Sequence, residues 1–189
     1  MDLKYVQTTC PYCGTGCSFN LVVKDGKVVG TAPYHRSPVN EGKVCPKGTY
    51  AHEFVNSPDR LTKPLIKKDG TFVEATWDEA LKLIASKFKS YKPDECACLA
   101  SARVSNEDNY AMMKFARGVL KTKHIDHCAR LCHASTVAGL ASIFGSGAMT
   151  NSIGDIAESK CVFIIGSNTF ECHPLIGRRV MQAKAKGAK

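Results

Sequence analysis

The chain has 189 residues, of which 44% are hydrophobic and 23% are charged, a composition typical of a globular protein rather than a disordered one. A formal net charge of +9 at pH 7 fits a solvated surface, a polyanionic cofactor or an acidic partner, and no compact basic run indicates nucleic-acid binding. No apolar run approaches the ~18 residues that a membrane span requires, and residues 1–5 lack the features of a secretory signal, so a cytoplasmic protein is expected.

The first 60 residues predict a small β-rich subdomain. A short strand is expected at residues 5–9. A hairpin is expected at residues 18–32, because Asp25 and Gly26 separate two runs that are rich in β-branched residues. A subdomain of this size is too small to build a sufficient core without a staple, such as a metal centre.

Residues 61–189 predict an α/β domain. A second hairpin is expected within residues 64–76, followed by a helix over 77–91 that Thr76 caps together with Glu79. The further elements expected are a strand at 96–100, helices at 106–120 and 135–144, a buried parallel strand at 162–166 and a helix at 174–186. This alternation predicts the start of an open α/β sheet. Because the last helix ends where another strand is expected, the domain is predicted to be incomplete and the chain to be the N-terminal portion of a longer protein.

Four of the ten cysteines predict a metal centre. Cys10, Cys13 and Cys17 form the pattern Cys-x2-Cys-x3-Cys, and Cys45 follows downstream. Without an export signal, such clustering indicates metal or redox chemistry rather than disulfides. Three thiolates from one loop and a fourth alone favour a [4Fe–4S] cluster. Zinc remains the alternative, although zinc ribbons usually present two separate Cys-x2-Cys pairs.

These motifs carry a family resemblance. Cys-Pro-Tyr-Cys-Gly-Thr-Gly-Cys at 10–17, Cys-Pro-Lys-Gly at 45–48 and residues 128–140 together resemble the molybdopterin oxidoreductase family, and within it the catalytic subunits of methanogen, deazaflavin-linked formate dehydrogenases. The resemblance implies a cluster subdomain at 1–60 and the first part of a molybdopterin-binding α/β domain at 61–189. It also implies two cofactors, a [4Fe–4S] cluster and a bis(molybdopterin guanine dinucleotide) that holds molybdenum or tungsten.

The resemblance assigns roles to individual residues. Cys132 matches the protein ligand of the molybdenum or tungsten, for which a soft thiolate is suited, and the alternative reading is a buried small hydrophobe. His133 follows it as in formate dehydrogenases, whereas similar nitrate reductases have Met there, and its imidazole can take or pass a proton near neutral pH. Lys47 is implied to lie between cluster and pterin and to ease electron transfer. Cys128 is expected to be a packing residue. The implied dinucleotide contacts are Arg103, Gly166, Ser167, Asn168, Glu171 and His173.

The implied activity is the reversible oxidation of formate to CO2, with electrons leaving through the cluster. The implied partner is a flavin- and iron–sulfur-containing beta subunit that reduces coenzyme F420, or a larger heterodisulfide reductase-type assembly. The 189 residues alone are expected to be inactive. The alternatives are a nitrate reductase of the same superfamily, a non-catalytic iron–sulfur electron-transfer module and a zinc-dependent nucleic-acid binder. An electron-transfer module would leave segments 128–140 and 166–174 unexplained.

Overall fold

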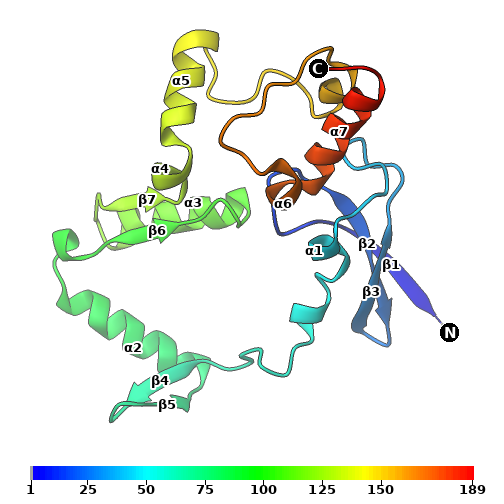
Figure 1. Cartoon of the computed structure of the whole chain (residues 1–189). Helices are drawn as coiled ribbons and strands as arrows, with labels where there is room; N and C mark the ends of the chain where they lie inside the picture. Colours follow the sequence, from blue (N-terminus) through cyan, green and yellow to red (C-terminus); the bar gives the residue numbers. More distant parts are fainter. Residues whose placement is uncertain (1) are drawn as a thin grey trace. The chain divides into compact units, whose positions relative to one another are not determined.

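The computed structural model describes residues 2–189, which form two compact units (Figure 1). The cysteine unit joins the residues up to Arg60 with Met149–Lys189, and the middle unit comprises Leu61–Ala148. The cysteine unit is therefore built from two stretches of sequence that the middle unit separates.

An antiparallel three-stranded sheet opens the cysteine unit, in the order β1 (Leu3–Thr9), β2 (Ser18–Lys24) and β3 (Lys27–Pro33). Asp25 and Gly26 turn the chain between β2 and β3 with φ of 49° and 77°, the left-handed conformation that an Asp-Gly hairpin turn requires. The predicted hairpin is confirmed. Phe19 on β2 is 1% exposed and forms the centre of a small core.

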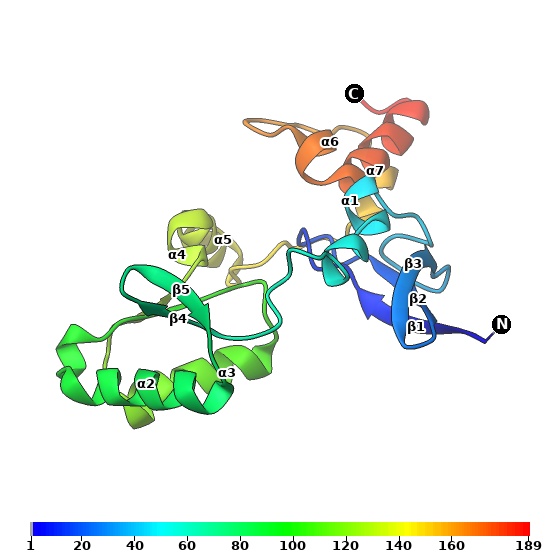
Figure 2. The ribbon, with the colours of Figure 1, turned by 90° about the horizontal axis from the view of Figure 1, so that it is seen from below.

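Short helical segments complete the cysteine unit. The first stretch ends in α1 (Pro46–Thr49) and the 3-10 turn η1 (Glu53–Val55). The second contains the 3-10 turn η4 (Gly154–Glu158), α6 (Thr169–Cys172) and α7 (Pro174–Ala185). In both views α6 lies beside α7, and α1 lies close to them (Figures 1 and 2). Leu175 and Ala183 on α7 are buried.

The predicted buried strand at residues 162–166 is wrong. The structure has no strand there, and Phe163 and Ile165 are 83% and 77% exposed. Only Val162 forms a backbone hydrogen bond, donating from its N–H to the carbonyl of Lys189 at 2.9 Å. A strand that is apolar on both faces needs neighbouring strands and helices on both sides of the sheet, and the described residues supply no such sheet around this segment.

The middle unit begins with a hairpin and a capped helix. Strands β4 (Leu65–Lys68) and β5 (Thr71–Glu74) pair antiparallel, and α2 (Trp77–Ser90) follows. At the start of α2, Thr76 Oγ1 accepts a hydrogen bond from the N–H of Glu79, and the Glu79 carboxylate accepts one from the N–H of Thr76. This is the predicted capping box.

The rest of the middle unit contains a short parallel sheet. After the 3-10 turn η2 (Pro93–Glu95), strand β6 (Cys98–Ala100) pairs parallel with β7 (Ile125–His127). Between them lie α3 (Asn106–Lys114) and the π-helical turn η3 (Phe115–Val119), so the helix predicted at 106–120 changes its hydrogen-bond pattern after residue 114. The short α4 (Ala129–Cys132) and α5 (Ala134–Phe144) follow β7. The expected open sheet is therefore represented, within residues 2–189, by two strands, and Leu99 on β6 is 85% exposed.

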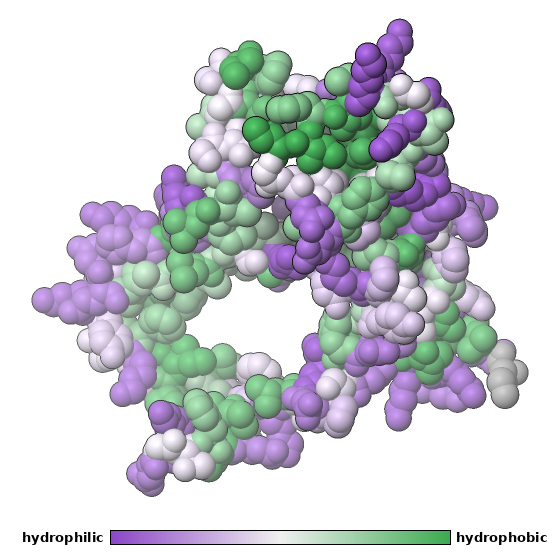
Figure 3. Space-filling view, viewed as in Figure 1, coloured by the Kyte–Doolittle hydropathy of each residue, from purple (hydrophilic) through white to green (hydrophobic). Residues whose placement is uncertain are grey.

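The middle unit leaves apolar side chains at its surface. Leu81 and Ile84 on α2 are 55% and 48% exposed. They line a groove of about 550 Å³ together with Phe88 and Phe115, whose rings meet edge to face at 5.7 Å. Figure 3 shows hydrophobic surface over α2.

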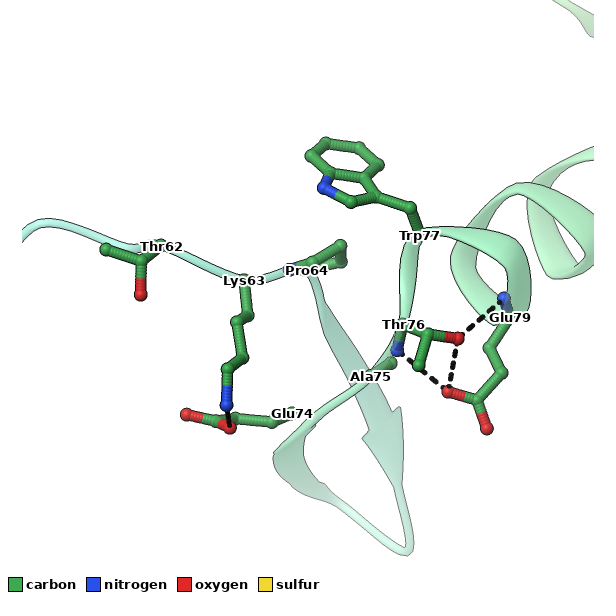
Figure 4. A pocket seen from close by; sticks show the side chains of 8 residues that line it. All are labelled: Thr62, Lys63, Pro64, Glu74, Ala75, Thr76, Trp77 and Glu79. Atoms are coloured by element: carbon green, nitrogen blue, oxygen red, sulfur yellow. Dashed lines mark hydrogen bonds and ion pairs between the residues drawn. The ribbon is translucent and has the colours of Figure 1, made fainter.

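A second pocket, of about 470 Å³, lies between the β4–β5 hairpin and the start of α2 (Figure 4). Lys63 Nζ donates to Glu74 Oε2 at 2.6 Å on one side, and the capping box closes the other. None of the site residues predicted from the sequence lines this pocket.

No helix in the described part of the chain is both long enough and apolar enough to cross a bilayer.

Candidate functional site

Three of the four clustered cysteines lie in the loop between β1 and β2. The N–H of Cys10 donates to the carbonyl of Cys17 at 2.8 Å, which closes this loop where the two strands begin to pair. Gly16 has φ of 74°, a left-handed conformation that glycine adopts without steric cost. The loop therefore has the tight turns that three closely spaced ligands need.

The fourth cysteine, Cys45, is the residue before the first turn of α1, and Pro46 begins the helix. Gly48 in this helix lies against the first cysteine loop, because a Cβ placed on it would lie 3.4 Å from Cys10 Sγ and 2.5 Å from a methyl carbon of Val44. A side chain at position 48 would therefore collide with Val44, whereas its Cβ would be in ordinary van der Waals contact with Cys10 Sγ. Gly48 thus lies directly against the side chain of Cys10, three residues after Cys45.

A buried side chain that the sequence analysis missed, Asn40, holds the two cysteine-bearing segments together. Asn40 is 1% exposed. Its Oδ1 accepts from the N–H of Ser18 at 2.9 Å, and its Nδ2 donates to the carbonyls of Ser18 and Lys43 at 3.0 and 2.7 Å. Ser18 follows Cys17, and Lys43 lies two residues before Cys45. No local sequence pattern predicts this role, because the residues in contact, Ser18 and Asn40, are 22 positions apart in the sequence.

Two of the four thiols, Cys10 and Cys17, have a pKa that burial and the neighbouring thiols raise. Burial is the main cause that raises the pKa of Cys17 to about 11, and the neighbouring thiols of Cys10, Cys13 and Cys45 contribute to the same rise. Burial is also the main cause of the raised pKa of Cys10, to which Cys45 and Cys13 add. Thiolates at these positions would repel one another, so a cationic group among them would favour their charged form.

Cys13 differs from the other two. Burial alone would raise its pKa, but hydrogen bonds with the side chain and backbone of Thr15 outweigh burial, and the nearby Lys47 ammonium adds to them, so the pKa is lowered overall. Cys13 Sγ lies 3.3 Å from Thr15 Oγ1. Lys47 is thus close enough to Cys13 to stabilise negative charge on its sulfur.

The donor set fits an iron–sulfur cluster. Within residues 2–189, no three His, Cys, Asp or Glu side chains are close enough together to bind a single metal ion. The neighbouring thiols nevertheless raise the pKa of Cys10 and of Cys17, so these two side chains lie in the electrostatic field of the other cysteines. A [4Fe–4S] cluster requires only one thiolate for each of four different iron atoms, and four cysteines with a lysine beside them supply such a set.

The predicted dinucleotide loop, residues 166–173, belongs to the same unit. Lys47 Nζ donates to the backbone carbonyl of Glu171 at 3.4 Å, so one side chain links the cysteine cluster to this loop. Glu171 Oε2 accepts from Asn168 Nδ2 at 2.8 Å, and Ser167 Oγ lies 3.0 Å from Thr169 Oγ1. His173 precedes α7. The structure therefore brings together the cysteines, Lys47 and Glu171.

The other predicted site residues, Arg103, Cys132 and His133, belong to the middle unit. Cys132 ends α4, and its Sγ lies 2.7 Å from Nδ1 of His133, the next residue. Both side chains are exposed, so the alternative reading of Cys132 as a buried hydrophobe is wrong. Arg130, a cationic residue close to Cys132 in the sequence, forms an ion pair with Asp126 at 2.9 Å. The polar contact of the Cys132 thiol is instead with His133.

Cys128 is not the packing residue that was expected. It is exposed, and its Sγ accepts a hydrogen bond from the N–H of Ala102 at 3.2 Å. Ala102 lies beside Arg103 in the loop after β6. Cys128 therefore ties the loop that carries Arg103 to the start of α4, the helix that ends at Cys132.

Comparison with known proteins shows to which family both parts of the chain belong. Residues 3–57 match the family model of the molybdopterin oxidoreductase Fe4S4 domain, and residues 60–189 match that of molybdopterin oxidoreductases. The chain belongs to the molybdopterin oxidoreductase family. The resemblance inferred from the sequence is confirmed.

Individual relatives narrow the comparison. The chain is 62% identical over 189 residues to the F420-dependent formate dehydrogenase 1 subunit alpha of Methanococcus maripaludis, and 61% identical over 189 residues to the F420-dependent formate dehydrogenase subunit alpha of Methanocaldococcus jannaschii. It is 44% identical over 192 residues to a probable oxidoreductase of Bacillus subtilis. These alignments cover 99–100% of this chain, but the chain spans only 28% of the length of the two methanogen proteins and 20% of the third.

Proposed function

We propose that this chain contributes to a formate dehydrogenase alpha subunit and that the whole protein catalyses the reversible oxidation of formate to CO2. The observation that carries the proposal is the identity of 61–64%, along the full length of the chain, to three F420-dependent formate dehydrogenase alpha subunits. The adjacent Cys132 and His133 support it, since this pair distinguishes formate dehydrogenases from similar nitrate reductases in the family resemblance.

We propose a [4Fe–4S] cluster on Cys10, Cys13, Cys17 and Cys45, and a bis(molybdopterin guanine dinucleotide) with molybdenum or tungsten. For the dinucleotides, the loop 166–173 and Arg103 are the proposed contacts. The left-handed Gly166, with φ of 62°, and the exposed guanidinium of Arg103 suit phosphate binding. When bound, the metal centre supplies the two-electron chemistry on the carbon of formate, and the cluster carries electrons away singly.

Cys132 and His133 are proposed to act as a pair. Oxidation of formate to CO2 releases two electrons and one proton. Because Nδ1 of His133 lies 2.7 Å from the Cys132 sulfur, it can accept the thiol proton when the thiolate becomes a metal ligand. Once this first proton has passed to solvent, the neutral imidazole would again have a free basic nitrogen and could take the proton that leaves formate.

Lys47 is proposed to assist electron transfer between the two cofactors. Its ammonium lowers the pKa of Cys13, and its Nζ donates to the carbonyl of Glu171 in the proposed dinucleotide loop. A positive charge at this place stabilises an added electron on either side of it.

The proposed functional division is residues 1–60 for the cluster and 61–189 for molybdopterin binding, although 149–189 pack with the first region in one compact unit.

The proposed partner is a flavin- and iron–sulfur-containing beta subunit that reduces coenzyme F420, alone or within a heterodisulfide reductase-type assembly. The names of the methanogen relatives, which are alpha subunits of F420-dependent formate dehydrogenases, support this partner. Ten cysteines suit the reducing cytoplasm. The 189 residues alone are proposed to be inactive, because they correspond to only 28% of the length of the methanogen relatives.

The test is an assay of formate and nitrate turnover in the full-length enzyme with Cys132→Ala. We expect wild-type enzyme to oxidise formate and not to reduce nitrate. The Cys132→Ala variant should retain iron and pterin but lose formate oxidation, because the dinucleotides hold the cofactor by many other contacts. Cys161→Ala, which removes an exposed cysteine outside the proposed site, is the matched control and should remain active. Formate oxidation by Cys132→Ala at the wild-type rate would refute the assignment.

A further inference from the structure

A charged side chain is buried in the cysteine unit at a place that the proposed chemistry does not use. The side chain of Arg179, in the middle of α7, is 9% exposed. Its Nη2 lies 3.0 Å from Glu41 Oε1 and donates to the carbonyl of Val39 at 3.5 Å, while its Nη1 donates to Gln182 Oε1 at 3.1 Å. Burying a guanidinium is costly unless it is paired, so these partners fix where α7 lies against the segment 39–41.

The partner, Glu41, occupies a defined position between the cysteine segments. It has φ of 51° and is followed by Gly42 with φ of 79°, so the chain turns sharply at this point. The preceding residue, Asn40, holds Ser18 and Lys43 by its three hydrogen bonds. The carboxylate of Glu41 is therefore attached through one peptide unit to the side chain that positions the segments carrying Cys17 and Cys45.

The other end of the connection is the proposed dinucleotide loop. This loop, residues 166–173, runs directly into α7, and Gly177 on α7 packs against Phe170, since a Cβ at position 177 would lie 2.9 Å from the Phe170 ring. The loop is thus packed on the helix that Arg179 anchors. The loop has a second attachment to the cysteine segments, the hydrogen bond from Lys47 to the carbonyl of Glu171. At 3.4 Å this bond is longer than the 3.0 Å contact between Arg179 and Glu41, and it lies at the surface.

We propose that the Glu41–Arg179 ion pair is a positioning device that holds the dinucleotide loop at a fixed separation from the cysteine cluster, so that electrons pass efficiently between the cofactors bound at the two places. This inference rests on the proposed function. Glu41 and Arg179 touch neither the proposed cluster ligands nor the proposed dinucleotide contacts; they act through Asn40 and through α7. Arg178, whose Nη1 lies 3.7 Å from Glu41 Oε2, makes a weaker contribution to the same connection.

The pair also has a matched control on the same helix. Lys186, at the C-terminal end of α7, forms an ion pair with Glu158 of η4. This second pair attaches α7 to a different segment and has no contact with residues 39–45. Breaking it changes one ion pair of α7 without changing the connection to the cysteine segments.

The experiment compares Glu41→Gln, Arg179→Lys and Glu158→Gln in the full-length, cofactor-loaded enzyme. Two rates are measured by rapid mixing: reduction of the cluster by formate and direct reduction of the cluster by dithionite. Glu41→Gln removes the charge and keeps the shape of a side chain that is 49% exposed, so folding and iron content should be preserved. Since a misplacement of ~1 Å can slow a geometry-dependent step by up to ~100-fold, we expect formate-driven cluster reduction to fall at least ~10-fold, with KM for formate and dithionite reduction unchanged.

A second readout does not depend on turnover. Amide hydrogen exchange in residues 166–173 should become faster in Glu41→Gln and Arg179→Lys, and should stay at the wild-type rate in Glu158→Gln. Formate-driven reduction within twofold of wild type in both variants would overturn the proposal, and so would equal slowing in Glu158→Gln. If the wild-type enzyme does not oxidise formate, the proposed function fails, while the exchange measurement still decides whether the ion pair positions the loop.

Discussion

Replacing Asn40 by alanine should destabilise the cysteine unit more than any change of an exposed polar residue in it. The side chain is 1% exposed and makes three hydrogen bonds, to the N–H and carbonyl of Ser18 and to the carbonyl of Lys43. Each such hydrogen bond contributes a net ~1 kcal/mol to the free energy of unfolding, and its removal leaves a backbone group without a hydrogen-bond partner. The expected decrease in the free energy of unfolding is therefore about 3 kcal/mol, with a loss of iron because the Cys45 segment is released.

The measurement is anaerobic urea unfolding of the cluster-loaded protein, followed by cluster absorbance and circular dichroism, together with iron analysis of the purified variants. Asn20→Ala is the control, because Asn20 is in the same sheet and its Nδ2 makes one exposed hydrogen bond, to the carbonyl of Pro33 at 3.0 Å. A surface change of this kind alters stability by only ~0.5 kcal/mol. If Asn40→Ala and Asn20→Ala lose the same stability and keep the same iron, Asn40 does not hold the two cysteine segments together.

Substitutions at three other residues test the remaining assignments. Cys13→Ala should remove most of the iron and loosen the N-terminal sheet, and iron analysis showing unchanged content would exclude Cys13 as a ligand. Lys47→Ala should keep cluster and pterin but slow the reduction of the physiological acceptor, so normal turnover with that acceptor would contradict the proposed role. Cys128→Ser keeps an acceptor for the N–H of Ala102 whereas Cys128→Ala does not. Hydrogen exchange at residues 101–103 should therefore rise in the alanine variant alone, and equal exchange in both would show that the sulfur does not hold this loop.

The residue types at neighbouring positions were sufficient to predict the two hairpins and the capped helix. Asp25-Gly26 and Asp69-Gly70 both adopt left-handed φ values, and Thr76 with Glu79 forms the capping box, because turn and cap energies depend on residues within a few positions of one another. The spacing of the clustered cysteines was equally informative, since three of them share one short loop.

Contacts between distant segments were not predictable in the same way. The residues at 162–166 have the composition of a buried strand, yet strand formation depends on neighbours that composition does not reveal. Similarly, nothing around Glu41 or Arg179 in the sequence indicates that they pair, because the contact joins segments about 140 residues apart. Asn40 was missed for the same reason, and Cys128 was misread because its partner, Ala102, is 26 residues away.

The discontinuous sequence of the cysteine unit has a consequence for its biogenesis. Val39 leaves the ribosome long before Arg179, with which it shares a hydrogen bond across 140 residues. At ~5–20 residues per second, synthesis of the intervening chain takes roughly 7 to 28 s. During this interval Val39 and Glu41 lack their partners on α7. A cluster inserted during translation would therefore bind before residues 39–41 are anchored on α7, whereas a cluster inserted afterwards would bind to the anchored segment.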